Sequence, residues 1–459
     1  MVMKSVKILI WLVALICARG GVTAVSAQTP FIIYLECIDN VDQDVTISFD
    51  RIGMVSGNDT TYFTPNVNRI NSLDISGLQL VFAEGALSDK VYDRIIFYIK
   101  EVSTKIDHAR LTPKINAEGY PLLIDLHLAK YAENSLFIKW QPNYHEVDSN
   151  FYRLNFSIVK KHLPPIGSLL LVTNSGSQSL TVVDRNSQQV VKSIVVGQNP
   201  TEMIYLSSQR YVYVLITGDN VICVVDLNSM ELIKELSTNY NSEPIRLVLS
   251  GDEKYLYVLN KAGNSVTVYD AFNLLEISQY LVDFDPTDLE VNELTGQLFV
   301  SSGFNEYFSV IDANNNKRQL NVERVPAEFI LIPDEELIIS AGANDNSIAG
   351  YNLNNGATKF RVKVCDRIEN MIYNHDIKTL YASIPGCTQI SYIKPQDELE
   401  INTLNLKETP GRIATDLEFQ NLYVTFPGSN KIGIYNINSR RLVKFVPVGE
   451  KPYTVLVPN

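Results

Sequence analysis

The chain has 459 residues, of which 46% are hydrophobic and 10% aromatic, so it has the composition of a folded protein and the length of two or three domains. Its net charge is −12 and it contains no run of basic residues, which argues against nucleic acid and anionic membrane as partners. Tyrosine is abundant, with 24 residues, and this favours strands over helices.

Residues 1–27 have the features of a secretory signal peptide. Lys4 and Lys7 precede an apolar run at 8–17, and small residues lead up to a cleavage site before Gln28. The alternative is a membrane anchor, but the run is short for a bilayer and Arg19 ends it. We therefore expect an exported protein, periplasmic, cell-surface or extracellular, with no transmembrane helix after signal cleavage.

Residues 28–162 contain seven runs of strand length, rich in β-branched and aromatic residues and separated by Asn, Asp, Gly and Pro. They read FIIYLECI, DVTISFDRIGMV, LQLVFA, YDRIIFYIKEV, YPLLIDL, NSLFIKW and FYRLNFSIV. This spacing predicts a β-sandwich domain. The order of these segments resembles a domain family of unknown function with a transthyretin-like or carbohydrate-binding-like sandwich, a resemblance that implies no catalytic residue.

Two aromatic residues near the end of this domain are candidates for ligand stacking. Trp140 and Tyr144 could form a platform for a sugar ring. The alternative, which we favour, is that Trp140 alternates inward with Phe137 and fills the core. The histidines of the domain are scattered over different elements, so we expect no metal site there.

Residues 163–167 contain paired prolines and a glycine, and we interpret them as a linker. From 168 to 459 a fixed period governs the chain. Second-strand markers recur at intervals of 40 to 44 residues, at Leu171, Tyr213, Tyr257, Phe299, Ile339, Tyr381 and Tyr423. A second series ends the next strand in the same register, at Asp184, Asp226, Asp270, Asp312, Asn352, Lys394 and Asn436.

Each repeat adds a third strand and then a strand led by proline, at Pro200, Pro244, Pro286, Pro326, Pro410 and Pro452, with Arg367 in the corresponding place of the exceptional unit. Four short strands per repeat predict a β-propeller of seven blades. The first repeat begins at its second strand and the chain ends on an isolated leading strand, PYTVLVPN. We therefore expect the last strand to complete the first blade and close the ring.

The segments LYVTFPGSNKIGIYNINSRRLVKFVPVGEKPYTVLVPN and LLLVTNSGSQSLTVVDRNSQQVVKSIVVGQNP resemble the YVTN-type propeller repeats of bacterial and archaeal surface and periplasmic proteins. The likeness covers residues 168–459 and weakens in the fifth and sixth repeats. The Asp that ends most third strands precedes a turn, so we interpret it as a turn cap rather than a metal ligand.

The register of the repeats nominates one disulfide. Cys365 lies in the connection leading into a blade and Cys387 in the turn between the second and third strands of that blade, two positions on the same face. Cys223 lies within a predicted strand, where we expect a buried thiol. Asp283, Asp285 and Asp288 could gather calcium, but we favour solvated acids in a connection.

No sequence motif for catalysis, cofactor binding or metal ligation stands out, and His375 is the one histidine of the repeats. We therefore expect an exported non-enzymatic binding or scaffold protein that presents propeller loops to a protein or glycan at the cell envelope. One alternative is a propeller-type hydrolase or lyase acting on a lactone or saccharide. Another is a structural component of a cell-envelope surface layer.

Overall fold

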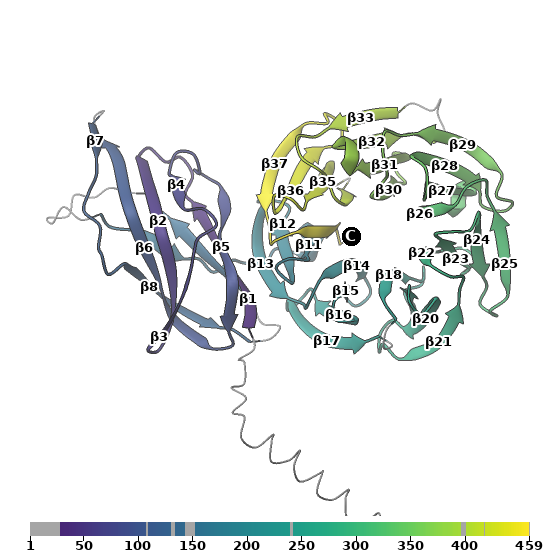
Figure 1. Cartoon of the computed structure of the whole chain (residues 1–459), viewed down its shortest axis with the longest axis horizontal. Helices are drawn as coiled ribbons and strands as arrows, with labels where there is room; N and C mark the ends of the chain where they lie inside the picture. Colours follow the sequence, from purple (N-terminus) through teal and green to yellow (C-terminus); the bar gives the residue numbers. More distant parts are fainter. Residues whose placement is uncertain are drawn as a thin grey trace, which may run out of the picture.

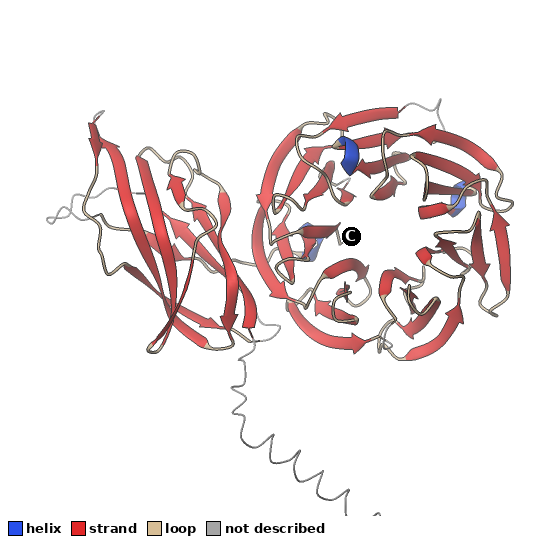
Figure 2. Ribbon diagram, in the orientation of Figure 1, coloured by secondary structure: helices blue, strands red, loops and turns tan. Residues whose placement is uncertain are grey.

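A computed structural model describes residues 28–106, 109–129, 134–142, 152–238, 242–395, 401–416 and 418–458. Two all-β parts lie side by side, a sandwich and a ring of radiating sheets (Figure 1). Strands dominate both parts, and the helices among the described residues are three short 3-10 turns (Figure 2). Tyr144 lies outside the described residues.

The sandwich sheet that faces the ring has the strand order β10-β9-β1-β5. In it β1 pairs parallel with β9 and antiparallel with β5. Its strands are β1 (Gln28–Cys37), β5 (Gln79–Ser88), β9 (Ser135–Trp140) and β10 (Phe156–Ile158). The seven runs expected from the sequence each contribute a strand to the sandwich.

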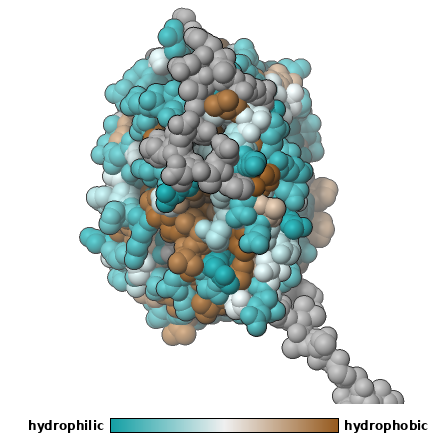
Figure 3. Space-filling view, turned by 90° about the vertical axis from the view of Figure 1, so that its left-hand side faces the viewer, coloured by the Kyte–Doolittle hydropathy of each residue, from teal (hydrophilic) through white to brown (hydrophobic). Residues whose placement is uncertain are grey.

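The second sandwich sheet has the order β3-β2-β6-β7, with β4 beside β2 and β8 beside β6. Its strands are β2 (Asp44–Ser56), β3 (Asp59–Phe63), β4 (Arg69–Asn71), β6 (Val91–Ile106), β7 (Ala109–Leu111) and β8 (Tyr120–His127). The core between the sheets includes Phe49, Phe97 and Trp140. Brown side chains gather on the outer face of this sheet (Figure 3), where Val91 and Leu123 are exposed.

Seven four-stranded antiparallel sheets of the described residues radiate from a common axis as propeller blades (Figure 1). Blade 1 contains β11 (Leu169–Asn174), β12 (Ser179–Asp184), β13 (Gln189–Val195) and β38 (Pro452–Leu456). Blade 2 contains β14 (Pro200–Leu206), β15 (Tyr211–Ile216), β16 (Val221–Asp226) and β17 (Glu231–Ser237). Blade 3 contains β18 (Pro244–Leu249), β19 (Tyr255–Asn260), β20 (Ser265–Asp270) and β21 (Glu276–Leu281).

Blade 4 contains β22 (Pro286–Val291), β23 (Leu298–Ser302), β24 (Tyr307–Ile311) and β25 (Lys317–Asn321). Blade 5 contains β26 (Pro326–Ile332), β27 (Leu337–Gly342), β28 (Ser347–Asn352) and β29 (Thr358–Lys363). Blade 6 contains β30 (Asn370–Asn374), β31 (Thr379–Ile384), β32 (Gln389–Ile393) and β33 (Ile401–Asn405), and blade 7 contains β34 (Ile413–Asp416), β35 (Asn421–Phe426), β36 (Lys431–Asn436) and β37 (Leu442–Pro447). The 3-10 turns are η1 (Ile166–Ser168), η2 (Pro333–Glu335) and η3 (Pro385–Cys387).

The C-terminal strand closes the ring. β38 pairs antiparallel with β11, so the last strand of the chain is the innermost strand of blade 1 (Figure 1). The seven blades and this closure confirm the fold expected from the repeat count. Five leading strands begin at their proline, where no ladder donor is lost.

The Asp and Asn residues that end six of the third strands are turn caps, as their position before a turn indicated. The carboxylate of Asp184 accepts hydrogen bonds from the N–H groups of Asn186 and Ser187, at 3.1 and 3.2 Å. Asp270 and Asn352 make the same pair of contacts in their own blades. These side chains therefore fix turns and do not point toward a shared ligand.

Buried apolar side chains fill the layers between neighbouring blades. One such cluster joins blade 7 to blade 1 and also contains Ile32, Tyr34 and Phe137 of the sandwich. Their neighbours along β1, Phe31 and Ile33, point into the sandwich core instead. The strand is buried on both faces, which explains its unbroken apolar run.

The sandwich also covers the outer edge of blade 1. Gln79 exchanges two hydrogen bonds with the backbone of Val190, and the Ser135 hydroxyl accepts one from Ser193 N–H at 3.2 Å. β13 is consequently largely buried, whereas the outer strand of blade 2, β17, is largely exposed. The first domain thus covers an edge strand whose outward-facing N–H groups would otherwise be open to pairing with another chain.

Candidate functional site

The seven leading strands line the axis of the ring and each presents a side chain at the same register position. That position lies two residues after the leading proline, and it precedes the residue paired with the middle of the second strand. In blade 6 the pairing register puts Ile368, and not Arg367 as the sequence suggested, in the place of the proline. We call these residues the channel ring: Glu202, Arg246, Asp288, Glu328, Asn370, Arg412 and Thr454. In five of the strands the pairing register shifts here, as in a β-bulge, which re-aims the side chain.

Two guanidinium groups connect the acids of the ring. Arg246 contacts Asp288 at 3.0 Å, Glu290 at 2.9 Å and Glu202 at 3.4 Å. Arg412 reaches from blade 7 to the other oxygen of Glu202 in blade 2, and its guanidinium lies 4.9 Å from the Tyr453 ring centroid. Glu202 therefore holds two cations from two different blades.

The remaining contacts complete a circuit around the axis. The Asp288 carboxylate accepts the N–H of Phe329 in blade 5 at 2.9 Å. Glu328 accepts the Asn370 amide of blade 6 at 2.8 Å, and Asn370 accepts the N–H of Ile413 in blade 7 at 3.0 Å. The ring side chains thus link blades 2 to 7 in a circuit that passes over blade 1, where the Thr454 hydroxyl is buried without a hydrogen-bond partner among the described residues.

Burial in the channel shifts the pKa values of these acids. Desolvation, opposed by Arg246, raises the pKa of Glu290 to about 7. Desolvation, opposed by Arg412, likewise raises the pKa of Glu328 to about 7. For Glu202 burial acts in the same direction, but Arg412 and Arg246 outweigh it and its pKa is lowered. Two of the four carboxyl groups are therefore poised to exchange protons near neutral pH.

The chemistry of the channel is that of an ion-pair network. Among the described residues, no group of three or more His, Cys, Asp or Glu side chains is placed to hold a metal ion. The acids are separated by guanidinium groups, each of which is engaged with more than one partner. The channel is thus neither an assembled metal centre nor an apolar, amide-lined bore.

Sequence reasoning missed the channel ring, although its signal was present. The prolines that mark the leading strands were recognised, and the residue two positions after each of them is charged in five of the six proline-led repeats. No single repeat looks unusual. Only the closed ring brings these seven positions together.

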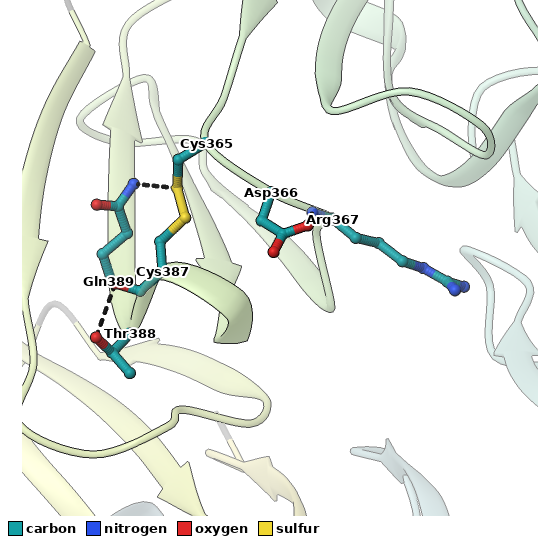
Figure 4. Close-up of a disulfide and its surroundings, with 6 residues drawn as sticks. All are labelled: Cys365, Asp366, Arg367, Cys387, Thr388 and Gln389. Atoms are coloured by element: carbon teal, nitrogen blue, oxygen red, sulfur yellow. Dashed lines mark hydrogen bonds between the residues drawn. A yellow bond between two sulfur atoms is a disulfide. The ribbon is translucent and has the colours of Figure 1, made fainter.

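Cys365 and Cys387, the pair expected from the register, are joined by a disulfide with their Cα atoms 6.4 Å apart. Gln389 Nε2 lies 2.9 Å from Cys365 Sγ, while Arg367 extends away from the bridge (Figure 4). The disulfide links the connection into blade 6 to the turn before β32. Cys223 is buried in β16 and its thiol donates to the carbonyl of Val196 at 3.1 Å.

The stacking platform expected at Trp140 is not available, because this side chain is fully buried in the sandwich core. Its ring packs edge-on against Phe156, with centroids 6.3 Å apart. Phe137, three residues earlier, points to the opposite face and stacks on Tyr34 at the propeller, so the two do not share the core as the sequence suggested.

The acids considered for calcium are held apart. Asp288 belongs to the channel ring, Asp283 accepts a hydrogen bond from Ser309, and Asp285 pairs with Lys261 at 3.1 Å. His375 is exposed on a turn with its ring edge-on to Tyr373. Neither feature assembles a site.

The two faces of the propeller differ in what they carry. One face, which we call the connection face, bears the segments between blades, such as 282–285, and the turns between second and third strands, such as 303–306. The other, the turn face, bears the remaining turns, such as 292–297. The disulfide and the start of every leading strand, with its channel-ring residue, lie toward the connection face.

A cavity of about 420 Å³ lies between the sandwich and blades 1 and 2, bordered by Thr29, Asp89 and Asp219. A second, of about 520 Å³, lies between blades 6 and 7, bordered by Tyr392 and Arg440. Arg440 stacks on Tyr392 with its guanidinium carbon 5.0 Å from the ring centroid. Both cavities are open to solvent and are lined by a mixture of polar and apolar side chains.

Comparison with known proteins supports the propeller. A family described as YNCE-like beta-propeller matches residues 166–336, which contain three strands of blade 1, the whole of blades 2 to 4 and the leading strand of blade 5. No curated protein matches the chain in sequence. Within the described residues, no helix is long and apolar enough to span a membrane.

Several solved structures share the fold at low identity. A functionally unknown protein from Desulfotomaculum acetoxidans has a TM-score of 0.56 and 12% identity, over 63% of this chain and 98% of that one. A candidate 6-phosphogluconolactonase from Bacteroides fragilis has a TM-score of 0.53 and 14% identity, over 63% and 97%. The dihydro-heme d1 dehydrogenase NirN has a TM-score of 0.51 and 13% identity, over 65% and 76%.

Proposed function

We propose that the protein is an exported, non-enzymatic binding or scaffold protein whose propeller presents the loops of its connection face to a protein or glycan partner at the cell envelope. The observation that carries this proposal is the circuit of contacts in the channel ring. Its charged side chains pair with groups of neighbouring blades, so they stabilise the propeller. The loops of the connection face are then the surface that is available for binding a partner.

The loops themselves suit this role. They carry polar and aromatic side chains on backbone that is tied down, as where Gly303 N–H donates to Asp285 O at 3.0 Å. Anchored loops lose little conformational entropy when a partner binds. The docked sandwich adds a second surface beside blade 1.

A pair of charge reversals on opposite faces of blade 4 tests the proposal. Glu306 is exposed on the connection face and Glu293 is exposed on the turn face. With the full mature chain immobilised, Glu306→Lys should reduce retention of envelope proteins or glycans, and Glu293→Lys should leave it unchanged. A wild-type chain that retains no specific envelope component would contradict the proposal.

A second candidate function is hydrolysis or elimination on a lactone or saccharide in the channel. It is favoured by one observation, the raised pKa values of Glu290 and Glu328 near 7, because acid and base catalysis requires carboxyl groups that titrate near the working pH. Turnover of a lactone or oligosaccharide panel that disappears in both Glu290→Gln and Glu328→Gln would establish it. Equal turnover by these variants and the wild type would remove it.

A further inference from the structure

Blade 4 carries two exposed phenylalanines on the connection face. Phe284, in the connection before β22, is 72% exposed, and Phe304, in the turn after β23, is 68% exposed. Their rings stack with centroids 6.0 Å apart and planes inclined by 26°. Two large apolar rings left in solvent and stacked on each other form a small, defined platform.

The other blades show that this pair is specific to blade 4. All seven turns between second and third strands have the same length, so the residues equivalent to Phe304 can be compared directly: Gly176, Gly218, Ala262, Asn344, Gly386 and Gly428. The residues two positions before the leading proline, equivalent to Phe284, include Gln198, Ser242, Arg324 and Glu450.

The two positions are neighbours in other blades as well. A Cβ placed on Gly176 would lie 2.9 Å from the Cβ of Glu450, and one placed on Gly218 would lie 2.9 Å from the Cβ of Gln198. The usual blade therefore sets a small turn residue under a polar connection residue. Blade 4 has phenylalanine at both of these positions, and the two rings are exposed and do not contribute to the hydrophobic core.

The backbone beneath the rings is held in place. Ser302 Oγ donates to the carbonyl of Phe284 at 2.9 Å, and Asn264 Oδ1 accepts the N–H of Asp285 at 3.0 Å. The platform is thus pre-formed, and binding to it costs little ordering of the loops.

The surroundings of the platform are acidic. The connections and turns of blades 3, 4 and 5 on this face hold six carboxylates and two cations: Glu243, Asp283, Asp285, Glu306, Glu323 and Asp345 against Lys261 and Arg324. Each cation is paired, Lys261 with Asp285 at 3.1 Å and Arg324 with Asp345 at 4.0 Å. Exposed aromatic faces and surplus carboxylates both attract guanidinium and ammonium groups.

We propose that the Phe284–Phe304 platform docks a basic segment of a partner protein, which lays an arginine or lysine side chain across the rings and meets the surrounding carboxylates. This inference rests on the proposed binding function and names the chemistry of its partner. A second copy of this chain fits less well, because the chain carries a net charge of −12.

The test uses the full chain and a fluorescent octapeptide of alternating arginine and glycine, with citrulline replacing arginine in a neutral control peptide. We expect the arginine peptide to bind, and the citrulline peptide and the Phe284→Ser/Phe304→Ser variant each to weaken binding about tenfold. Leu294→Ser is the matched control, because Leu294 is 70% exposed in a turn of the same blade on the opposite face. That variant should bind the arginine peptide as the wild type does.

Equal binding of the arginine peptide by the double variant, or equal binding of both peptides by the wild type, would overturn the inference. Self-association of the wild type that is lost in the double variant would also overturn it, because the occupant would then be a second copy of the chain. Retention of an uncharged oligosaccharide that is lost in the double variant would overturn it as well, because the occupant would then be a glycan. If the double variant retains the same envelope partner as the wild type, this inference fails while the proposed function stands. If the wild type retains no envelope partner, the proposed function itself is contradicted.

Discussion

Gln79 of the sandwich and Val190 of blade 1 exchange two hydrogen bonds: Gln79 Oε1 accepts the Val190 N–H at 2.8 Å, and Gln79 Nε2 donates to the Val190 carbonyl at 3.1 Å. The amide side chain thereby replaces a neighbouring strand at the outer edge of β13. Both residues are buried, so water cannot take over these contacts if the side chain is lost.

Gln79→Leu should therefore lower the free energy of unfolding by about 1–3 kcal/mol, since it leaves a buried N–H and a buried carbonyl unpaired. Chemical denaturation measures this loss, and limited proteolysis at 159–168 should reveal a loosened sandwich. Gln279→Leu is the control, because Gln279 bonds within its own blade, to Ser265 at 2.9 Å. An equal loss in both variants would contradict a special role for Gln79 at the interface.

The seam between blades 7 and 1 contains a buried ion pair. Arg185 pairs with Asp416, their side chains are 1% and 2% exposed, and the guanidinium carbon lies 4.6 Å from the Phe419 ring centroid. Asp416→Ala should cost about 3–5 kcal/mol, because it leaves the guanidinium buried with its main counter-charge removed. Thermal unfolding of this variant should be compared with that of Asp59→Ala, which removes an exposed pair with Lys90 and should change the midpoint little. Similar midpoints for the two variants would refute the importance of the seam pair.

The disulfide in blade 6 should stabilise the connection face. Cys365 and Cys387 are 22 residues apart in sequence, and a loop of that size predicts a loss of about 3 kcal/mol when both are changed to serine. Denaturation with and without reductant checks this. Reductant should destabilise the wild type and leave the Cys365→Ser/Cys387→Ser variant unaffected, and an unaffected wild type would argue against the bridge.

The carboxyl groups of Glu290 and Glu328 make stability depend on pH in a defined direction. Their folded-state pKa values are raised to about 7 from 4.5, so the folded protein binds more protons than the unfolded chain between these values. The free energy of unfolding should therefore fall as pH rises from about 4.5 to about 7, by at most roughly 3 kcal/mol per carboxyl.

Glu290→Gln and Glu328→Gln remove this dependence. Each variant should match the wild type near pH 4.5 and exceed it in stability near pH 8, because glutamine is neutral at both. Denaturation curves across this range supply the test. Parallel pH profiles for wild type and variants would show that these two groups titrate normally.

Much of the fold could be predicted because propeller repeats leave a period in the sequence. The closure could also be predicted, because the first repeat begins at its second strand and the last segment is a leading strand, which together complete one blade. The docking of the sandwich on the propeller was not predicted, although the sequence of β1 contains a sign of it. The run FIIYLEC lacks the alternation of a strand with one wet face, since Ile32 and Tyr34 pack on the propeller.

The candidate sites were harder to predict than the fold. Four blades lie between Glu202 and Arg412 along the chain, but the closed ring leaves one blade between them and lets them meet across the channel. Phe284 and Phe304 each look like ordinary loop residues until the equivalent positions of all blades are aligned.

The apolar cluster at the seam draws on Ile32 near the start of the described chain and Val455 near its end. During synthesis this cluster stays incomplete until the final strand has emerged, although most blades can already have formed. Contacts of such sequence separation slow folding and couple distant parts of a chain. The sandwich and the propeller should therefore acquire their final stability in one late, cooperative step, and loss of the last strand should weaken the first domain.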